Sequence, residues 1–298
     1  MDYLQFDGVF AGGGIKAIAF IGALEEMEQK GFTFNRLAGT SAGGIFSALI
    51  KAGYTSSELK TEVESVDFQQ FLDPKPSIIP FSFMKWLGLY KRLGLYKGVE
   101  FENWLTEMLK KKGISTFGDI EKGSLKLIAS DLTQGRLVVL PDDLPDYGVV
   151  PEKFSIARAV RMSSSLPYFF EPIKIYNGKG EVSIFVDGGL LSNFPMWLFM
   201  NKKGGKLKRP VIGFNLTPDL DKVKPNEINN AIEMFTSLFK TMRTAHDLRY
   251  ISEEHAKNIV FIPVDNVNTT DFNLKIKEKE TLIDLGRNKT EAFFKSWH

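Results

Sequence analysis

The sequence lacks cysteine altogether and has only three histidines among its 298 residues. The absence of cysteine excludes disulfides, a cysteine nucleophile, thiolate zinc sites and cysteine-ligated iron–sulfur clusters. Three histidines also leave little room for a metal site built from several imidazoles. Chemistry in this protein must therefore use serine, threonine, aspartate, glutamate, lysine or arginine, with at most two or three histidines assisting.

A charge imbalance and a long hydrophobic run are missing as well. The chain has 38 lysines and arginines against 36 aspartates and glutamates, and its net charge of +2 gives no global attraction to nucleic acid. No stretch approaches the roughly 18 uncharged apolar residues of a membrane-spanning helix. The N-terminus has neither the basic nor the apolar region of a secretory signal. We therefore expect a soluble protein, in the cytoplasm or on a membrane surface, although export without a cleaved signal stays open.

Apolar residues are plentiful, by contrast. Hydrophobic residues make up 43% of the chain and charged residues 25%, which is typical of a globular protein with a sizeable core. No repeat, linker or change of composition marks a domain boundary, so we expect a single domain over residues 1–298. The count of 25 phenylalanines is unusually high.

Strands and helices alternate over the first fifty residues. Residues 3–10 and 32–38 have the pattern of strands, and the apolar positions of residues 15–30 and 45–52 have helical spacing. This alternation predicts an α/β fold with a largely parallel sheet. Further along, we expect helices at 55–66, 99–112, 155–163, 226–257 and 275–297, and strands at 125–130, 136–140, 182–186 and 210–215.

A G-x-S-x-G pentapeptide lies between the second predicted strand and the helix that follows it. Its residues Gly39, Ser41 and Gly43 stand in the strand–turn–helix context that a nucleophile elbow requires. Such a turn projects the serine hydroxyl above the sheet edge, and the glycines allow the flanking backbone to come close. The helix N-terminus beneath it favours negative charge. The pattern therefore predicts that Ser41 is a nucleophile.

Three consecutive glycines, Gly12, Gly13 and Gly14, follow the first predicted strand. One interpretation is a dinucleotide-binding loop, but that requires an acidic residue at the end of the second strand, which here runs straight into the Ser41 turn. The other is an oxyanion hole made of backbone N–H groups. The nearby candidate nucleophile favours the oxyanion hole. Lys16 follows the glycines and would add positive charge to the site or simply lie on the surface.

A serine nucleophile needs a proton acceptor, and two kinds are available. By chain order, Asp187 followed by His246 or His255 would complete a Ser–Asp–His triad. However, His246 falls inside a predicted helix, His255 in a charged stretch, and His298 is the last residue. Alternatively, Asp187 itself is the base, since it follows an apolar run and precedes Gly188 and Gly189, where partial burial would raise its pKa.

Taken together, these elements resemble the patatin-like phospholipase family. They are the glycine loop, the Ser41 pentapeptide and the Asp187-Gly188-Gly189 motif, with support from residues 163–167 and 193–195. The resemblance spans residues 3–216, the motif-bearing core, and a helical region of about residues 220–298 follows it. It implies a three-layer α/β/α fold with a mostly parallel central sheet and extra C-terminal helices.

The resemblance also implies hydrolysis of the carboxylic esters of phospholipids or related lipids. In this family Ser41 would be the nucleophile, Asp187 the base in a dyad without histidine, and the Gly12–Gly14 amides the oxyanion hole. Neither a metal nor a cofactor is required. Rival interpretations are an α/β-hydrolase esterase with a histidine base, a lipid acyltransferase and a catalytically silent lipid-binding protein. The sequence does not predict the oligomeric state.

A cationic, aromatic segment without acidic residues covers residues 75–97. Interleaved rings and positive charges suit either a membrane interface or a lid over the site, with an ordinary core-packed helix as the alternative. The residues that would make this contact are Phe81, Phe83, Lys85, Trp86, Lys91 and Arg92.

Overall fold

The strand–helix alternation predicted for the N-terminal part is present in the structure, a computed structural model. It describes residues 5–73, 92–177, 180–200, 208–216, 256–264 and 272–297, with a few single positions between 228 and 267. Strand β1 (Gln5–Phe10) is buried along five of its six residues, as expected of a central strand covered on both faces. It leads through a 3₁₀ turn into α1 (Ala19–Gln29), then into β2 (Thr33–Thr40) and α2 (Ala42–Lys51).

Within the part of the chain that the structure describes, the central sheet has eight strands, and four of its seven strand pairs are parallel. Its order is β10-β9-β1-β2-β4-β8-β7, and β5 also pairs with β4. Strands β10, β9, β1, β2 and β4 pair with their neighbours in this order as parallel strands, whereas β5 and β8 pair with β4, and β7 with β8, as antiparallel strands. This confirms the α/β class and the mostly parallel sheet. The later strands are β4 (Leu125–Asp131), β5 (Arg136–Leu140), β7 (Ile173–Tyr176), β8 (Val182–Asp187), β9 (Val211–Asn215) and β10 (Ile259–Phe261).

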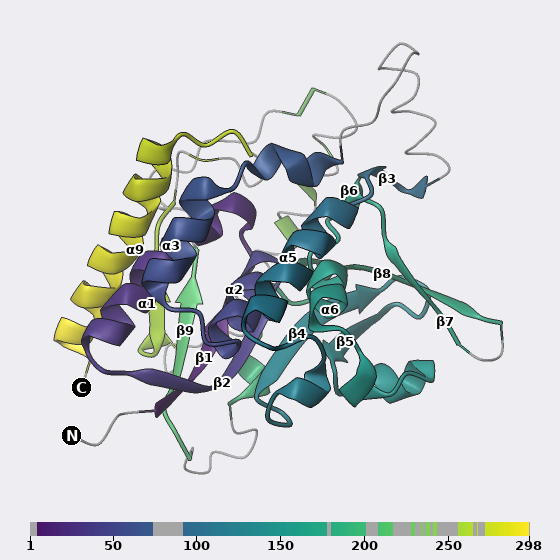
Figure 1. Ribbon diagram of the computed structural model, residues 1–298, viewed down its shortest axis with the longest axis horizontal. Helices are drawn as coiled ribbons and strands as arrows, with labels where there is room; N and C mark the ends of the chain where they lie inside the picture. Colours follow the sequence, from purple (N-terminus) through teal and green to yellow (C-terminus); the bar gives the residue numbers. More distant parts are fainter. Residues whose placement is uncertain are drawn as a thin grey trace.

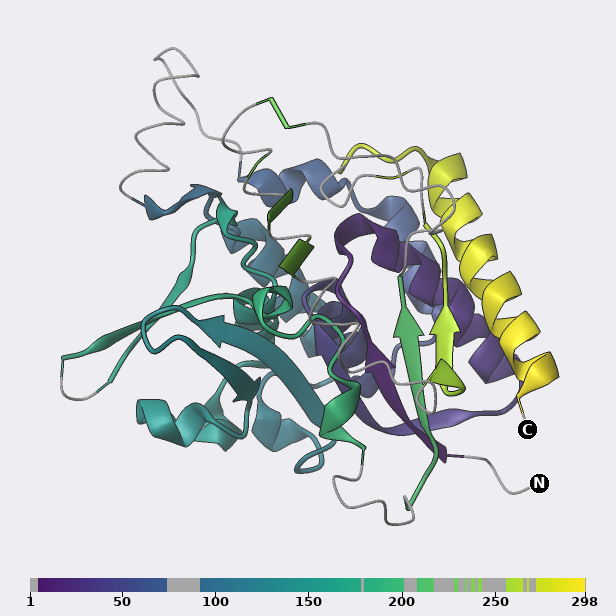
Figure 2. The ribbon, with the colours of Figure 1, turned by 180° about the vertical axis from the view of Figure 1, so that it is seen from behind.

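Helices cover one face of this sheet and a thinner layer covers the other (Figures 1 and 2). The first layer contains α1, α2, α3 (Ser56–Ser65), α5 (Val99–Lys111), α6 (Ile156–Ser163) and α9 (Ile276–Ser296). On the opposite face, Phe194, Met196 and Phe199 pack against β1 and β9, and Met196 begins a short 3₁₀ helix (Met196–Leu198). The layers therefore follow the expected helix–sheet–helix order. No helix within the described ranges is long and apolar enough to cross a membrane.

The predicted elements agree with the structure to within about three residues wherever the structure describes them, with one exception: the helix predicted at 15–30 begins as a 3₁₀ helix (Gly14–Ile18), and α1 starts only at Ala19. Four short strands were not predicted: β7, β10, and the separate pair β3 (Gly94–Tyr96) and β6 (Tyr168–Phe170). Helix α2 starts three residues before the predicted 45, inside the pentapeptide, because Ser41 alone separates it from β2. Most of the predicted helix 226–257 lies outside the described residues, as does segment 74–91 with Phe81, Phe83, Lys85, Trp86 and Lys91.

Two glycines allow the C-terminal helix to lie directly against α1. A Cβ atom at Gly22 of α1 would overlap the backbone of α9 at Ile283, and one at Gly286 of α9 would overlap the carbonyl of Ala19. Beside this crossing, aromatic rings from both ends of the chain pack together: Phe6, Phe32, Phe294 and Trp297. The terminal helix is thus part of the main core.

This contact predicts that Gly22→Ala destabilises the protein, although alanine normally favours a helix. The added methyl group meets backbone atoms that cannot rotate away, so we expect the free energy of unfolding to fall by about 1–3 kcal/mol. Denaturant unfolding followed by circular dichroism measures the change. The exposed α9 variant Lys289→Ala is the control and should stay within about 0.5 kcal/mol of the unaltered protein. Equal stability of both variants would contradict the close contact.

Candidate active site

Ser41 is the single residue between β2 and α2, and its backbone is strained. Its φ of 54° and ψ of −125° lie where residues with side chains rarely stand, at a cost of about 1–3 kcal/mol. Three hydrogen bonds hold this conformation. The Ser41 amide donates to Ser163 Oγ at 2.9 Å, and the Ser41 carbonyl accepts from the amides of Gly44 and Ile45 at 2.8 and 3.2 Å. The surrounding structure therefore imposes the turn that the pentapeptide predicts.

The glycines on either side of Ser41 are required by close backbone contacts. A Cβ atom at Gly43 would overlap the carbonyl oxygen of Phe10 in β1, and one at Gly39 would overlap the backbone of Gly43. Any side chain at either position would push α2 away from the sheet. These contacts explain in physical terms why the elbow contains glycine two residues before and two after the serine.

Asp187 reaches Ser41 because both residues lie at the same level of β4. In the parallel β2–β4 pair Thr40 lies opposite Ile128, and in the antiparallel β4–β8 pair Ala129 lies opposite Asp187. The two chain ends thus meet beside one strand, and the Ser41 hydroxyl donates to Asp187 Oδ2 at 2.6 Å.

The Asp187 carboxylate is buried and oriented on several sides. Only 3% of the residue is exposed, and its other oxygen, Oδ1, accepts from the Gly189 amide at 2.7 Å. Its backbone amide donates to the Ser165 carbonyl at 2.9 Å, and its carbonyl accepts from Ser130 Oγ at 3.1 Å. At Gly188 a Cβ atom would overlap the Ile128 carbonyl. The Asp-Gly-Gly motif is therefore a fixed support for the carboxylate.

The glycine loop lies beside Ser41, and its three amides are not equivalent. The Gly12 amide donates to the Asn193 carbonyl at 3.1 Å and the Asn193 side chain donates back to the Gly12 carbonyl at 3.3 Å. Gly13 and Gly14, in contrast, line the pocket next to Ser41. Among the described residues, their amides have no hydrogen-bond acceptor. Gly12 thus holds the loop in place, while Gly13 and Gly14 lie at the pocket wall beside Ser41.

Lys16 ties the end of this loop to a distant part of the chain. Its ammonium group donates to the Val264 carbonyl at 2.8 Å, in the segment after β10. The side chain therefore does more than lie in solvent, and it fixes the position of the 3₁₀ turn that follows the glycines.

Sequence reasoning missed a buried arginine that supports both halves of the site. Arg161 of α6 is only 1% exposed, and burial lowers its pKa to about 10. Its guanidinium donates to the carbonyls of Lys97, Gly98 and Glu171 and to Ser165 Oγ. On the same stretch of chain, Ser163 accepts the hydrogen bond of the Ser41 amide, and the Ser165 carbonyl accepts that of the Asp187 amide. The sequence showed a serine-rich stretch here, but no local pattern indicates which atoms it contacts.

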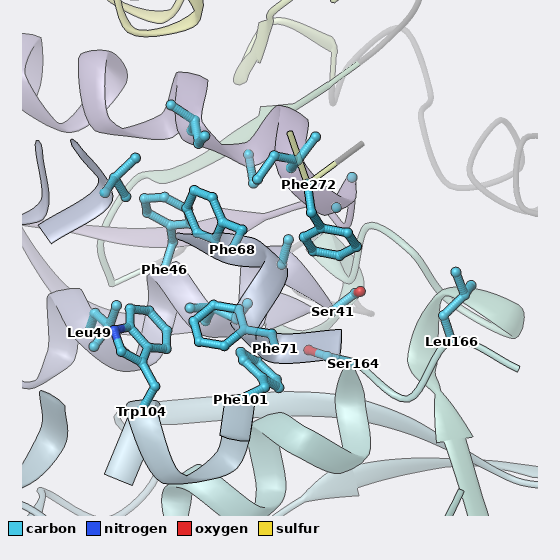
Figure 3. Close-up of a pocket in the computed structure, with 18 of the residues that line it drawn as sticks. Ser41, Phe46, Leu49, Phe68, Phe71, Phe101, Trp104, Ser164, Leu166 and Phe272 are labelled. Atoms are coloured by element: carbon cyan, nitrogen blue, oxygen red, sulfur yellow. The ribbon is translucent and has the colours of Figure 1, made fainter. Parts of the chain in front are cut away.

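An apolar pocket of about 160 Å³ leads away from Ser41 (Figure 3). Ser41, Ser164, Asp187 and Asn193 line its polar end. Aromatic rings from α2, α5 and the segments near residues 70, 170 and 272 make up much of the remaining wall: Phe46, Phe68, Phe71, Phe101, Trp104, Phe169, Phe170 and Phe272. The many phenylalanines of the sequence are thus partly accounted for by this pocket.

Other sequence candidates play no described part in the site. His246, His255 and His298 lie outside the described residues. Arg92, the described member of the predicted membrane or lid group, is 3.7 Å from Glu171 in an ion pair. Within the described ranges, no three histidine, aspartate or glutamate side chains cluster as metal ligands would.

Two neighbouring serines predict opposite effects on stability. Ser163→Ala removes the acceptor of the strained Ser41 amide, so the free energy of unfolding should fall by about 1–3 kcal/mol. Ser164 Oγ is buried with no partner among the described residues, so Ser164→Ala should be neutral or stabilising. Denaturant unfolding of both variants checks this pair. The same loss in both variants would contradict the hydrogen-bond pattern at the elbow.

Comparison with known proteins agrees with this geometry. The family model described as patatin-like phospholipase matches residues 8–200. An uncharacterised protein, YqhO of Bacillus subtilis, is 52% identical over 294 residues, which is 99% of each chain. A probable lipid hydrolase of invertebrate iridescent virus 6 is 23% identical over 66% of this chain and 65% of its own.

Two solved structures share the fold at low sequence identity. VipD of Legionella pneumophila superposes with a TM-score of 0.57 at 15% identity, over all of this chain and 67% of its own. ExoU, in its complex with SpcU from the type III secretion system of Pseudomonas aeruginosa, gives a TM-score of 0.55 at 20% identity, over 98% of this chain and 52% of its own. With a family model that covers the glycine loop, the elbow and Asp187, the chain belongs to the patatin-like phospholipase family.

Proposed function

We propose that this protein is a lipid acyl hydrolase that cleaves carboxylic esters with a Ser41–Asp187 dyad. The observation that carries the proposal is the 2.6 Å hydrogen bond from the Ser41 hydroxyl to the buried Asp187 carboxylate, at the mouth of an apolar pocket. A nucleophile hydrogen-bonded to a fixed base is the arrangement that covalent catalysis needs. The apolar pocket suits an acyl chain better than a polar substrate.

In the proposed first step, Ser41 Oγ attacks the ester carbonyl carbon and its proton passes to Asp187 Oδ2. The resulting oxyanion faces the amides of Gly13 and Gly14, at a site where the N-terminus of α2 also favours negative charge. Asp187 then returns the proton to the departing alcohol oxygen, which leaves an acyl ester on Ser41. A water molecule attacks this ester while Asp187 again accepts a proton, and the fatty acid is released as Ser41 regains its hydrogen.

The carboxylate can take this role without a histidine because it is already in contact with the hydroxyl. In a Ser–His–Asp triad, by contrast, the imidazole lies between serine and aspartate. Here the 2.6 Å separation leaves no space for a ring between Ser41 and Asp187. The geometry thus favours the dyad over the histidine-based esterase.

We further propose that the substrate is taken from a lipid surface at the β3–β6 corner. Leu93, just before β3, and Tyr168, at the start of β6, are 42% and 44% exposed. Leu166 and Phe169, on either side of Tyr168, line the pocket. Exposed apolar side chains beside a pocket mouth suit contact with the acyl boundary of a lipid layer.

The dyad predicts that Ser41→Ala and Asp187→Asn each lower turnover by at least about 10³-fold, because each removes one member of a unit that acts together. Short p-nitrophenyl esters and a panel of phospholipids are the substrates to assay. His246→Ala and His255→Ala serve as controls and should retain activity. Full activity in Ser41→Ala would refute the mechanism, and loss in one histidine variant alone would favour the triad.

The lipid-surface contact predicts that Leu93→Asp and Tyr168→Asp lower activity on phospholipid vesicles but not on a soluble short-chain ester. A charge at this corner opposes entry into the acyl boundary while the dyad stays intact. Val150→Asp is the matched control. Val150 is at least as exposed as these two residues, at 52%, but it precedes the start of α6, and the site lies at the other end of that helix. Equal vesicle activity in all three variants would contradict the contact.

A further inference from the structure

We propose that Glu62 and Lys111 form a latch at the inner end of the acyl pocket, and that this latch limits the length of acyl chain the enzyme accepts. The inference rests on the proposed acyl hydrolase function and names the substrate property that the pocket selects. Short acyl chains fit with the latch closed, whereas long chains require it to open.

The volume of the pocket limits the length of the acyl chain that it can hold. A cavity of about 150 Å³ holds a molecule the size of benzene. The pocket beside Ser41 measures about 160 Å³, so it holds a chain of only a few carbons with the walls as they stand. A palmitoyl chain has more than twice as many carbons as benzene. It must therefore extend beyond the present inner wall.

The inner wall is formed by two helices with regularly spaced side chains. Leu59, Glu62 and Val63 of α3 line the pocket at positions i, i+3 and i+4, on one helical face. Trp104 and Met108 of α5 also line the pocket, at positions i and i+4 of their helix. In Figure 3 the pocket runs from Ser41 toward Leu49 and Trp104, so Trp104 of α5 lies at the end away from Ser41. Lys111 stands one turn beyond Met108 on α5.

Among the described residues that line this pocket, Glu62 is the one charged residue apart from Asp187. It also lines an open surface cleft between α3 and α5, together with Tyr54, Lys111 and Lys112. Its carboxylate accepts from Lys111 Nζ at 2.8 Å. A carboxylate on an apolar wall is costly unless its charged end reaches a partner or water. Glu62 meets this requirement by pairing on the cleft side, so its side chain separates the pocket from the cleft.

The ion pair can open at little cost. The Lys111 side chain is 59% exposed and that of Glu62 is 25% exposed, so solvent screens their attraction. If Glu62 swings into the cleft, the far end of a long chain can pass between α3 and α5. The adjacent pair of Glu58 and Lys112, 2.7 Å apart, would still join the helices. The latch thus discriminates between chain lengths without blocking long chains entirely.

The test compares kcat/KM for p-nitrophenyl palmitate and p-nitrophenyl hexanoate in the same detergent. Lys111→Ala frees Glu62 to move, so the palmitate-to-hexanoate ratio should rise about two- to fivefold, in keeping with an exposed ion pair. Glu62→Ala also removes the wall, and the ratio should rise about tenfold, as for a few methylene groups in an apolar pocket. Lys110→Ala is the control, because Lys110 pairs with Glu107 on the same helix and lines neither cavity.

The latch would be overturned if the palmitate-to-hexanoate ratio of both variants stayed within twofold of that of the unaltered enzyme. A rise of this ratio in Glu62→Ala alone would also overturn it. Binding of palmitate and hexanoate to Ser41→Ala, with and without each substitution, gives a second readout by titration calorimetry. The latch predicts the same shift in the affinity for palmitate relative to hexanoate. If this relative affinity does not change, the proposal is overturned, even if no ester is hydrolysed. Failure of the proposed function would appear differently, as no Ser41-dependent turnover of either ester.

Discussion

A short hydrogen bond between a serine hydroxyl and a buried carboxylate is the interaction on which the rest of the site depends. Ser41 and Asp187 are 146 positions apart, and their contact of 2.6 Å tolerates little error in the placement of either strand. The sheet supplies that accuracy, since β4 pairs with β2 on one side and with β8 on the other. An elbow and an acidic turn that are each common alone come into contact through this shared neighbour.

The accuracy has a cost in free energy that buried polar groups offset. The positive φ of Ser41 is unfavourable, and burial of Arg161 removes a cation from water. Each of these groups has its partners: Ser163 for the Ser41 amide, three carbonyls and Ser165 for the guanidinium. Because hydrogen-bonded polar networks rigidify their surroundings, Ser163 and Ser165 at the end of α6 hold Ser41 and Asp187 in place at once.

Local sequence patterns predicted the parts of the site that are local. Gly39, Ser41 and Gly43 follow from the geometry of one strand–helix turn, and the resemblance paired that turn with Asp187. The hydrogen bond of the Gly12 amide, in contrast, depends on Asn193, which lies far away in the sequence. The support by Arg161 depends likewise on Lys97 and Gly98, more than sixty positions away in the chain. Periodicity also missed β6, β7 and β10, because three or four residues are too few to establish alternation against a helix.

The C-terminal helix is linked to the same chemistry through the pocket wall. Lys279 of α9 is only 5% exposed, and burial lowers its pKa. Its ammonium donates to the carbonyls of Val63 and Val66 at the end of α3 and lies 4.9 Å from the ring centre of Phe68. A cation at a helix C-terminus stabilises that end. Since Val63 and Phe68 line the apolar pocket beside Ser41, α9 holds one wall of this pocket through Lys279, while Gly286 fixes α9 against α1. The C-terminal helix, which carries no recognisable motif, thus shapes the pocket without lining it.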